Sequence, residues 1–263
     1  MPDSDENSRY LKFAFVAGAI LGLAIIAAII LAVVRFPVIT AVDQAHWMQK
    51  QAPVLSKTPV PLRDITAEKA GRTSISAFGW TCEAPWVPVA TIKTTRLVER
   101  IVFKNGKSIG VFDPNQTIST AAGIARTLEE QGSHTQLEAE LGKDTMGSGY
   151  ELELETLQIT PQDFSVFMSN KRARRGAVLL FFKYMTVHDA NTELFSFSFE
   201  NLHGFQYGDP ARARGVEIHG YDWQGHSIQV SVGMGDGQQD HVLQSEINRV
   251  LQTLHWIGDT GSP

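Results

Sequence analysis

GVEIHGYDWQGHSIQVSVGM, residues 215–234, is the stretch that decides the fold. Valine and isoleucine alternate with polar residues on both sides of a central turn, which is the pattern of two strands that share one apolar face. The two apolar sets lie on the same face only if the loop between the strands has an odd number of residues. A three-residue loop, Trp223 to Gly225, meets this condition, pairs Ile218 with Val230 and puts the glycine at the left-handed position. The sequence therefore predicts an antiparallel hairpin in this register.

The other face of this hairpin carries the most compact group of polar side chains in the chain. Glu217, His219 and Tyr221 project from one strand on that face, and the predicted register sets Gln229 opposite His219. The simplest interpretation is the solvated face of a half-buried hairpin. The alternatives are a binding site, or the active face of a hydrolase or metal-dependent enzyme, which would need further ligands from elsewhere in the chain. These four residues are therefore candidate binding residues. The sequence assigns no catalytic residue and no metal ligand.

Patterns on both sides of this hairpin predict further elements. A helix follows it and should lie across the sheet, with an apolar face formed by Leu243, Ile247, Val250, Leu251 and Leu254. Upstream, RLVERIVF, KNG and KSIGVF predict a second hairpin. A three-residue loop in that hairpin pairs Ile101 with Ile109, whereas a two-residue Asn-Gly turn pairs Val102 with Ile109.

Two helices are expected in the middle of the chain. Ser148 and Glu151 make a capping box that favours a helix over residues 149–159, although leucines alternate there as they would in a strand. A longer helix is expected from Asn170 to Val187, and its apolar run is too short to cross a membrane.

These elements predict one α+β domain over residues 73–257, with an antiparallel sheet packed by helices, and a short tail over residues 258–263. The element order resembles that of the PsbP-like extrinsic proteins at the level of the fold. The resemblance rests on the aromatic opening strand SISAFGWTCEAPW, with its Pro85-Trp86 step, and on a final strand pair that leads into INRVLQTLHW. It covers roughly residues 74–256 and implies an accessory or assembly role, with no functional residue carried over. The N-terminal hydrophobic segment and the helical middle section depart from that family's pattern.

The motif HGFQYGDP, which begins at His203, raises the question of a second ligand site. Aromatic residues occupy odd positions from Phe195 to Tyr207, which predicts one long aromatic strand that bends near Asn201. On this interpretation the motif is the end of a core strand. His203 and Asp209 are kept as candidate binding residues.

Residues 13–34 form the strongest single signal in the chain. The segment FAFVAGAILGLAIIAAIILAVV has 22 residues without a charge. As a helix it would span about 33 Å, enough for a hydrocarbon core of roughly 30 Å. We expect an uncleaved single-pass anchor between a short tail, residues 1–12, and a proline-containing tether, residues 35–72. Small residues on one face of the anchor offer a surface for self-association: Ala14, Gly18 and Gly22.

The charges beside this segment predict its orientation. Arg9 and Lys12 precede it and Arg35 follows it, which favours a cytoplasmic N-terminus and an extracytoplasmic domain. An anchored domain of this size without a catalytic motif is expected to act as a non-enzymatic binding or assembly module in the cell envelope. Its expected partners are another envelope protein or anionic lipid headgroups.

Four cations crowd the start of the second central helix: Lys171, Arg172, Arg174 and Arg175. Positive charge is unfavourable at a helix N-terminus, so contact with an anionic surface such as lipid headgroups would offset it. The alternative is internal pairing with the acidic stretch from Glu129 to Glu155, which holds eight carboxylates.

The composition excludes several classes of function. A net charge of -5 gives no basic excess for binding nucleic acid. The single cysteine, Cys82, excludes an internal disulfide, and its apolar surroundings favour a buried thiol. The chain lacks the sequence motifs of P-loop, dinucleotide-binding, nucleophile-elbow and HExxH proteins, so no cofactor is expected.

Overall fold

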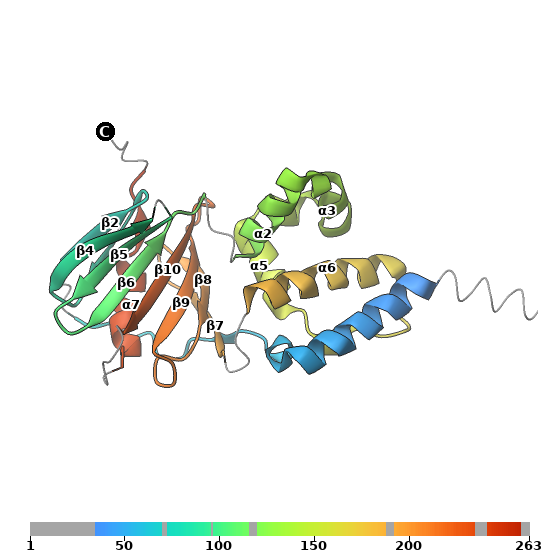
Figure 1. Cartoon of the computed structure of the whole chain (residues 1–263), viewed down its shortest axis with the longest axis horizontal. Coiled ribbons are helices and arrows are strands. Elements are labelled where there is room, and N and C mark those ends of the chain that lie inside the picture. The colour runs from blue at the N-terminus through green and yellow to red at the C-terminus, as the bar shows by residue number, and fades with distance from the viewer. Residues whose placement is uncertain are drawn as a thin grey trace, which may run out of the picture.

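The computed structural model describes residues 35–69, 73–95, 97–115, 120–187, 192–234 and 241–258. A β-rich part and a helical part lie side by side (Figure 1). The predicted α+β class with antiparallel sheets is confirmed. Within these ranges no helix has both the length and the apolar character needed to cross a bilayer. The predicted anchor, with Ala14, Gly18 and Gly22, lies outside the described residues, as do the N-terminal tail and residues 259–263.

The larger sheet has eight strands, and every neighbouring pair is antiparallel except β1 with β7. Across the sheet the order is β1 (Val60–Pro61), β7 (Leu194–Ser198), β8 (His203–Tyr207), β9 (Gly215–Tyr221), β10 (Ser227–Met234), β6 (Lys107–Phe112), β5 (Val98–Phe103) and β4 (Pro88–Thr95). The smaller sheet has three strands in the order β11 (His255–Trp256), β3 (Trp80–Ala84) and β2 (Thr73–Ala77).

One hydrophobic core joins the inner face of the larger sheet, the smaller sheet and α7 (Gln244–Thr253). The predicted terminal helix is therefore confirmed, and its apolar face buries Ile247, Val250, Leu251 and Leu254. Leu243 precedes the helix and stays exposed, because the helix begins one residue later.

Both predicted hairpins are confirmed, and the structure decides between the two registers that the sequence allows for the β5–β6 hairpin. In β9 and β10, Ile218 pairs with Val230 and His219 with Gln229, and Gly225 has a φ of 93° in the loop. In β5 and β6, Ile101 pairs with Ile109, so the three-residue loop is correct and the two-residue Asn-Gly turn is not. In both loops the left-handed conformation explains why glycine is needed.

Two predicted single strands are instead hairpins. The opening stretch SISAFGWTCEAPW folds back at Phe78 and Gly79, whose φ angles of 50° and 79° make a tight turn between β2 and β3. The stretch from Phe195 to Tyr207 does not bend as one strand, because Phe199 N–H donates to the Leu202 carbonyl and closes a turn between β7 and β8.

The β7–β8 turn splits the predicted aromatic face. The register pairs Phe197 with Gly204 and Ser196 with Phe205, so odd positions of one strand share a face with even positions of the next. Phe197 therefore packs in the main core, whereas Phe205 and Tyr207 point to the opposite face of the sheet. An alternation counted along the chain cannot detect this reversal.

The helical part is built from a helix over residues 35–51 and five further helices. They are α2 (Ala121–Leu128), α3 (His134–Leu141), α4 (Lys143–Met146), α5 (Gly149–Gln158) and α6 (Asn170–Thr186). The helix prediction for α5 is confirmed, and the Ser148 hydroxyl accepts a hydrogen bond from Glu151 N–H as the capping box requires. The α6 helix begins at Asn170 as predicted.

The first half of the predicted tether is part of this folded unit. The helix over residues 35–51 buries one face, including Val38 and Ala45, in a cluster with Ala173 and Leu180 of α6. Prolines interrupt the chain only after this helix, where it forms the short 3₁₀ helix Pro53–Ser56 and then strand β1. The sequence VITAVDQAHWMQKQ, residues 38–51, predicts a short helix between the first two prolines of the tether, and this helix is confirmed.

Lys183 of α6 is completely buried and ties three segments together. Its ammonium donates hydrogen bonds to the carbonyls of Lys57 at 2.6 Å, Leu157 at 2.8 Å and Ile159 at 2.7 Å. An ammonium has three donors, so all of them are used. Burial lowers the pKa of Lys183 to about 8, and the charge of Asp163 opposes this shift.

The helical part covers only one end of the outer face of the larger sheet (Figure 1). Leu157 of α5 and its neighbours pack there against Phe205, Tyr207 and Tyr221. The outer face of the strands beyond, β10, β6 and β5, borders a large pocket.

Candidate functional site

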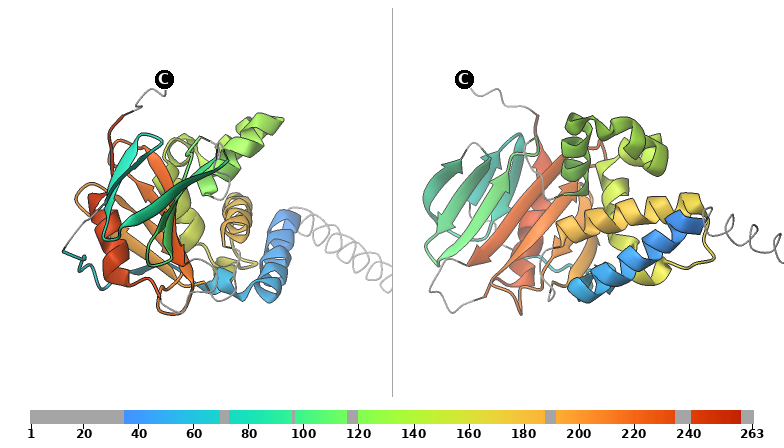
Figure 2. Two further views of the ribbon diagram at one scale, coloured as in Figure 1. Left: turned by 60° about the vertical axis from the view of Figure 1, so that its left-hand side comes forward. Right: turned by 45° about the vertical axis from the view of Figure 1, so that its right-hand side comes forward.

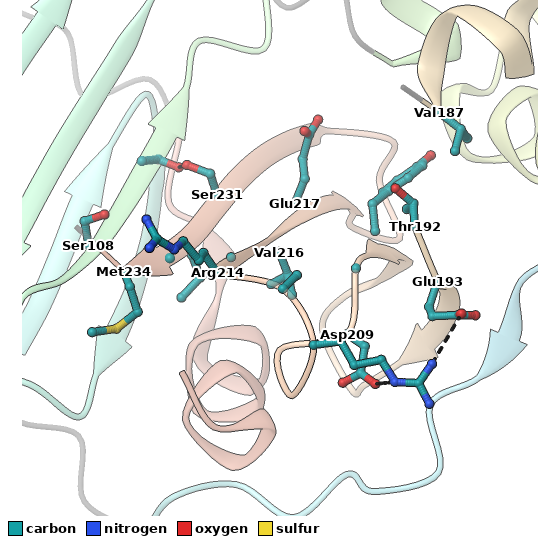
Figure 3. A pocket seen from close by; sticks show the side chains of 18 of the residues that line it. Ser108, Val187, Thr192, Glu193, Asp209, Arg214, Val216, Glu217, Ser231 and Met234 are labelled. Atoms are coloured by element: carbon teal, nitrogen blue, oxygen red, sulfur yellow. Dashed lines mark hydrogen bonds and ion pairs between the residues drawn. The ribbon is translucent and has the colours of Figure 1, made fainter. Parts of the chain in front are cut away.

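The pocket is a broad groove of about 1190 Å³ on the outer face of the larger sheet. Its walls are the turn that follows β8 on one side and the end of α6 on the other, and its floor is formed by β9, β10, β6 and β5 (Figure 3). The floor is low because the outward positions of these strands hold small residues: Ser108, Gly110, Gly215, Ser231 and Gly233.

Two exposed arginines reach over this floor. Arg100 of β5 donates a hydrogen bond to the Ser108 hydroxyl at 3.2 Å. Arg214 precedes β9, where its carbonyl accepts a hydrogen bond from Met234 N–H, and its side chain lies between Ser108 and Ser231 (Figure 3). In the part of the chain that the structure describes, neither guanidinium forms an ion pair with a carboxylate.

The cations at the rim of the groove are paired, in contrast. Lys57 lies 3.1 Å from Glu193, and Arg212 lies 3.5 Å from Asp209 and 3.8 Å from Glu193. The two cations and two carboxylates of the rim balance, which leaves Arg100, Arg214 and the carboxylate of Glu217 as the other charged groups that line the groove.

A buried polar cluster lies beneath the end of the groove that α5 covers. Its centre is Glu153 of α5, which is 0% exposed. The Glu153 carboxylate accepts hydrogen bonds from the hydroxyls of Tyr207 and Tyr221 and contacts Nδ1 of His219. Three partners around one carboxylate satisfy the buried charge, which would otherwise be costly to remove from water.

Glu217 connects this cluster to the groove. Its Oε1 lies 2.8 Å from Nε2 of His219 and also accepts a hydrogen bond from the Gln229 amide. The side chain of Glu217 is 39% exposed, whereas that of His219 is 1% exposed. Both ring nitrogens of His219 therefore face carboxylates, and the imidazole can donate to both only when it carries two protons.

The pKa values in the cluster agree with this hydrogen-bond pattern. Burial lowers the pKa of His219, but the charge of Glu153 and the hydrogen bonds to Glu153 and Glu217 outweigh it and raise the pKa to about 9. Burial and the charge of Glu153 raise the pKa of both Tyr207 and Tyr221 well above 10. At neutral pH the cluster therefore holds a charged His219 and two neutral tyrosines.

We expect stability to fall as the pH rises above neutral. The pKa of His219 is raised from 6.5 in the unfolded chain to about 9, so its contribution is fully present below 6.5 and is lost as the pH approaches 9. Between pH 6.5 and 8 the free energy of unfolding should drop by about 1–2 kcal/mol. Denaturant titrations at several pH values measure this, and a Glu153→Gln variant should give a flatter profile. An equally steep profile in the variant would assign the effect to other groups.

The titration of Lys183 limits the pH range in which the effect of His219 on stability can be measured. Its pKa is lowered from 10.5 to about 8, so the unfavourable contribution of its buried charge fades as the pH rises from 8 to 10.5. This gain opposes the loss from His219 at higher pH. The interval from pH 6.5 to 8 is therefore the one in which His219 dominates.

The structure brings together the four residues predicted on the hairpin. Glu217, His219 and Gln229 contact one another directly, and Tyr221 joins them through Glu153. The expectation of a solvated face is wrong for Tyr221 and His219, because α5 covers them. Glu217 is the member of the four that lines the groove.

The other two candidates lie apart from this cluster. His203 is buried between the rings of Tyr150 and Trp223, with centroid distances of 4.1 and 4.2 Å. Burial lowers its pKa, and the nearby charge of Asp222 opposes the shift. Asp209 lines the groove, where it accepts a hydrogen bond from Ala211 N–H.

Sequence reasoning missed Glu153, Tyr207, Arg100 and Arg214. A usable signal existed for Glu153, because Tyr150, Glu153 and Leu157 lie on one face of α5. An acidic residue on an apolar stripe needs a buried partner. The arginines gave no such signal, since their neighbours across the sheet are distant in sequence.

The cation cluster of α6 divides into two pairs. Arg174 lies 2.9 Å from Glu140, and Arg175 pairs with Glu155 and donates to the carbonyls of Glu140 and Leu141. These two arginines therefore show the internal pairing with the acidic stretch that the sequence offers as the alternative, and contact with an anionic surface stays a prediction. Lys171 and Arg172 are exposed in the first turn of the helix.

The described ranges contain no group of three His, Cys, Asp or Glu side chains that could hold a metal ion. Cys82 is buried, and burial together with the charge of Glu83 raises the pKa of its thiol to about 12. Comparison with protein-family models, curated proteins and solved structures finds no match to this chain. The function is therefore argued from the groove and the cluster beneath it.

Proposed function

We propose that this chain is a non-enzymatic binding module, held at a membrane by residues 13–34, that takes an elongated acidic ligand in the groove. The observation that carries the proposal is the pair of exposed arginines, Arg100 and Arg214, over a floor of small residues. Exposed guanidiniums that form no internal ion pair are available to carboxylates or other anions of a ligand.

The dimensions of the groove favour an extended ligand. Its volume of about 1190 Å³ is above the range of roughly 300–1,000 Å³ that is usual for small-molecule sites. Arg100 lies on β5 and Arg214 directly precedes β9, so their backbones are three strand positions apart, roughly 14 Å at about 4.8 Å per strand, and both side chains reach over the floor toward Ser108. A ligand with acidic groups along its length would contact both arginines.

The chemistry of the cluster supports binding rather than turnover. A general acid or base must come within hydrogen-bond reach of the substrate, and His219 is buried with both nitrogens engaged. The tyrosine hydroxyls donate to Glu153 and are equally covered. In the competing proposal, a hydrolase or metal-dependent enzyme uses Glu217, His219 and Tyr221. Of these three residues, Glu217 is the one that borders the groove.

Binding of a fluorescent acidic decapeptide to the purified full chain tests the proposal. An exposed ion pair contributes about 0.2–1 kcal/mol, so changing both Arg100 and Arg214 to glutamine should weaken binding by about tenfold. The matched control is Arg212→Gln, because this groove arginine is already paired with Asp209, and its effect should be small. Binding should weaken with salt.

Two results would contradict the proposal. Unchanged affinity in the double variant would remove the role of the arginines, and cleavage of the peptide by the wild-type chain would show an enzyme. The membrane anchor, the extracytoplasmic location and the accessory role implied by the PsbP-like resemblance stay predictions. A reporter fused to the C-terminus reads out on which side of the membrane the domain lies.

A further inference from the structure

Four exposed large hydrophobic side chains lie at one end of the helical part, and they include the two most exposed in the described ranges, Phe167 and Phe36. Phe167 is 89% exposed, Phe36 68% and Val166 52%, and Ile39 is also exposed. Isolated exposed hydrophobic residues are common, but a group of four at one end of a molecule marks an interaction site. We call these four residues the apolar tip.

The apolar tip lies where the described chain begins. The Arg35 guanidinium donates a hydrogen bond to the Met168 carbonyl at 3.0 Å. This bond joins the helix over residues 35–51 to the segment that holds Val166 and Phe167. Residue 35 of the helix over residues 35–51 and the start of α6 both lie at the end of the molecule that is farthest from the sheets (Figure 2). Residues 13–34, which carry no charge, precede Arg35 directly in the sequence.

Along the helix over residues 35–51, the exposed hydrophobic side chains lie mainly near residue 35. Ile39 follows Arg35 by four residues, which is about 6 Å along a helix. The polar interface on each side of a bilayer is about 5–8 Å thick. Farther along the same helix the exposed positions are mostly polar, such as Asp43, His46 and Lys50, with Trp47 as the exception.

We propose that the apolar tip lies in the interfacial layer of a lipid bilayer, where residues 13–34 enter it. Phe36, Val166 and Phe167 then contact the acyl boundary, and the rest of the helical part stands above the surface. Lys171 and Arg172 are exposed four and five residues after Phe167 in the sequence and contact anionic headgroups. Arg174 and Arg175 take no part, because carboxylates of the same chain bind them. This contact is independent of the groove.

Spin labelling of the full chain tests the contact. The chain carries a nitroxide at Phe167→Cys and is reconstituted in vesicles of phosphatidylcholine and phosphatidylglycerol. The native Cys82 is buried with a raised pKa, so it should not react. The control label is Met185→Cys, which is also exposed but lies at the other end of α6, about 23 Å along the helix from Asn170.

The measured quantity is the accessibility of each label to oxygen, which concentrates in the bilayer, relative to a water-soluble nickel complex. We expect this ratio to be several-fold higher at position 167 than at position 185. Equal ratios at the two positions, or a chain that does not co-float with the vesicles, would overturn the proposal.

A second comparison tests the two cations. Phosphatidylglycerol should raise the ratio at position 167 relative to vesicles of phosphatidylcholine alone, and changing Lys171 and Arg172 to glutamine should remove this dependence. If the dependence survives in the double variant, the cations are not the headgroup contact.

Discussion

Replacing Glu153 with leucine should lower the free energy of unfolding by about 3–5 kcal/mol, the largest effect expected of any single substitution in the polar cluster. The leucine fills a similar volume but leaves the hydroxyls of Tyr207 and Tyr221 and the imidazole of His219 without their acceptor. Each buried donor then loses its hydrogen bond, and the charged His219 loses its buried counterion. Chemical denaturation of the full chain in detergent, followed by tryptophan fluorescence, measures the difference.

The matched control for Glu153 is Glu151 of the same helix. Glu151 is exposed, so Glu151→Gln should change stability by no more than about 0.5 kcal/mol. Glu153→Gln should fall between the two, because the amide keeps an acceptor oxygen but not the charge. A loss below about 1 kcal/mol in Glu153→Leu would mean that the cluster does not hold α5 on the sheet.

Replacing Lys183 with methionine should lower the free energy of unfolding by a similar amount, about 3–5 kcal/mol. Methionine has nearly the same length, so the packing within α6 is retained, but the carbonyls of Lys57, Leu157 and Ile159 lose their donor. A buried carbonyl without a partner costs about 1–3 kcal/mol, and water can compensate only at the more exposed sites.

The control for Lys183 is Lys171→Met at the start of the same helix. Lys171 is exposed, and removing a positive charge from the first turn should be neutral or slightly stabilising. If Lys183→Met unfolds at the same denaturant concentration as wild type, the three hydrogen bonds do not contribute to stability. Because Lys183 and Glu153 share no contact, the double variant should show nearly additive losses.

The hairpins show what could be predicted from local sequence. The period of two along each strand and the glycine at the left-handed loop position together specify the pairing of Ile218 with Val230, and with it that of His219 with Gln229. For the β5–β6 hairpin the sequence allowed Ile109 to pair with Ile101 or with Val102, and the structure has the pairing with Ile101. The helix over Gly149–Gln158 was also predictable, since its capping box is local.

The same alternation gave a wrong prediction for residues 195–207, because the turn inside this stretch contains no glycine. Between Phe199 and Leu202 the chain reverses without a glycine, so the alternation runs through the turn uninterrupted. The helix over residues 38–51 was predictable from its own sequence, but its packing against Ala173 and Leu180 of α6 was not, because these partners are distant in the chain.

By itself the sequence determined the α+β class, the register of the β9–β10 hairpin, the two central helices and the amphipathic closing helix, because each follows from the spacing of neighbours in the chain. The tertiary structure alone decided that α5 closes over the hairpin. Glu153 meets Tyr207, His219 and Tyr221 across 54 to 68 residues, and Lys183 reaches Lys57 across 126. Contacts between such distant residues produce no repeating pattern in the sequence. They depend on which surfaces the folded chain brings together. That closure buries most of the predicted polar face and leaves Glu217 at the groove that Arg100 and Arg214 also line.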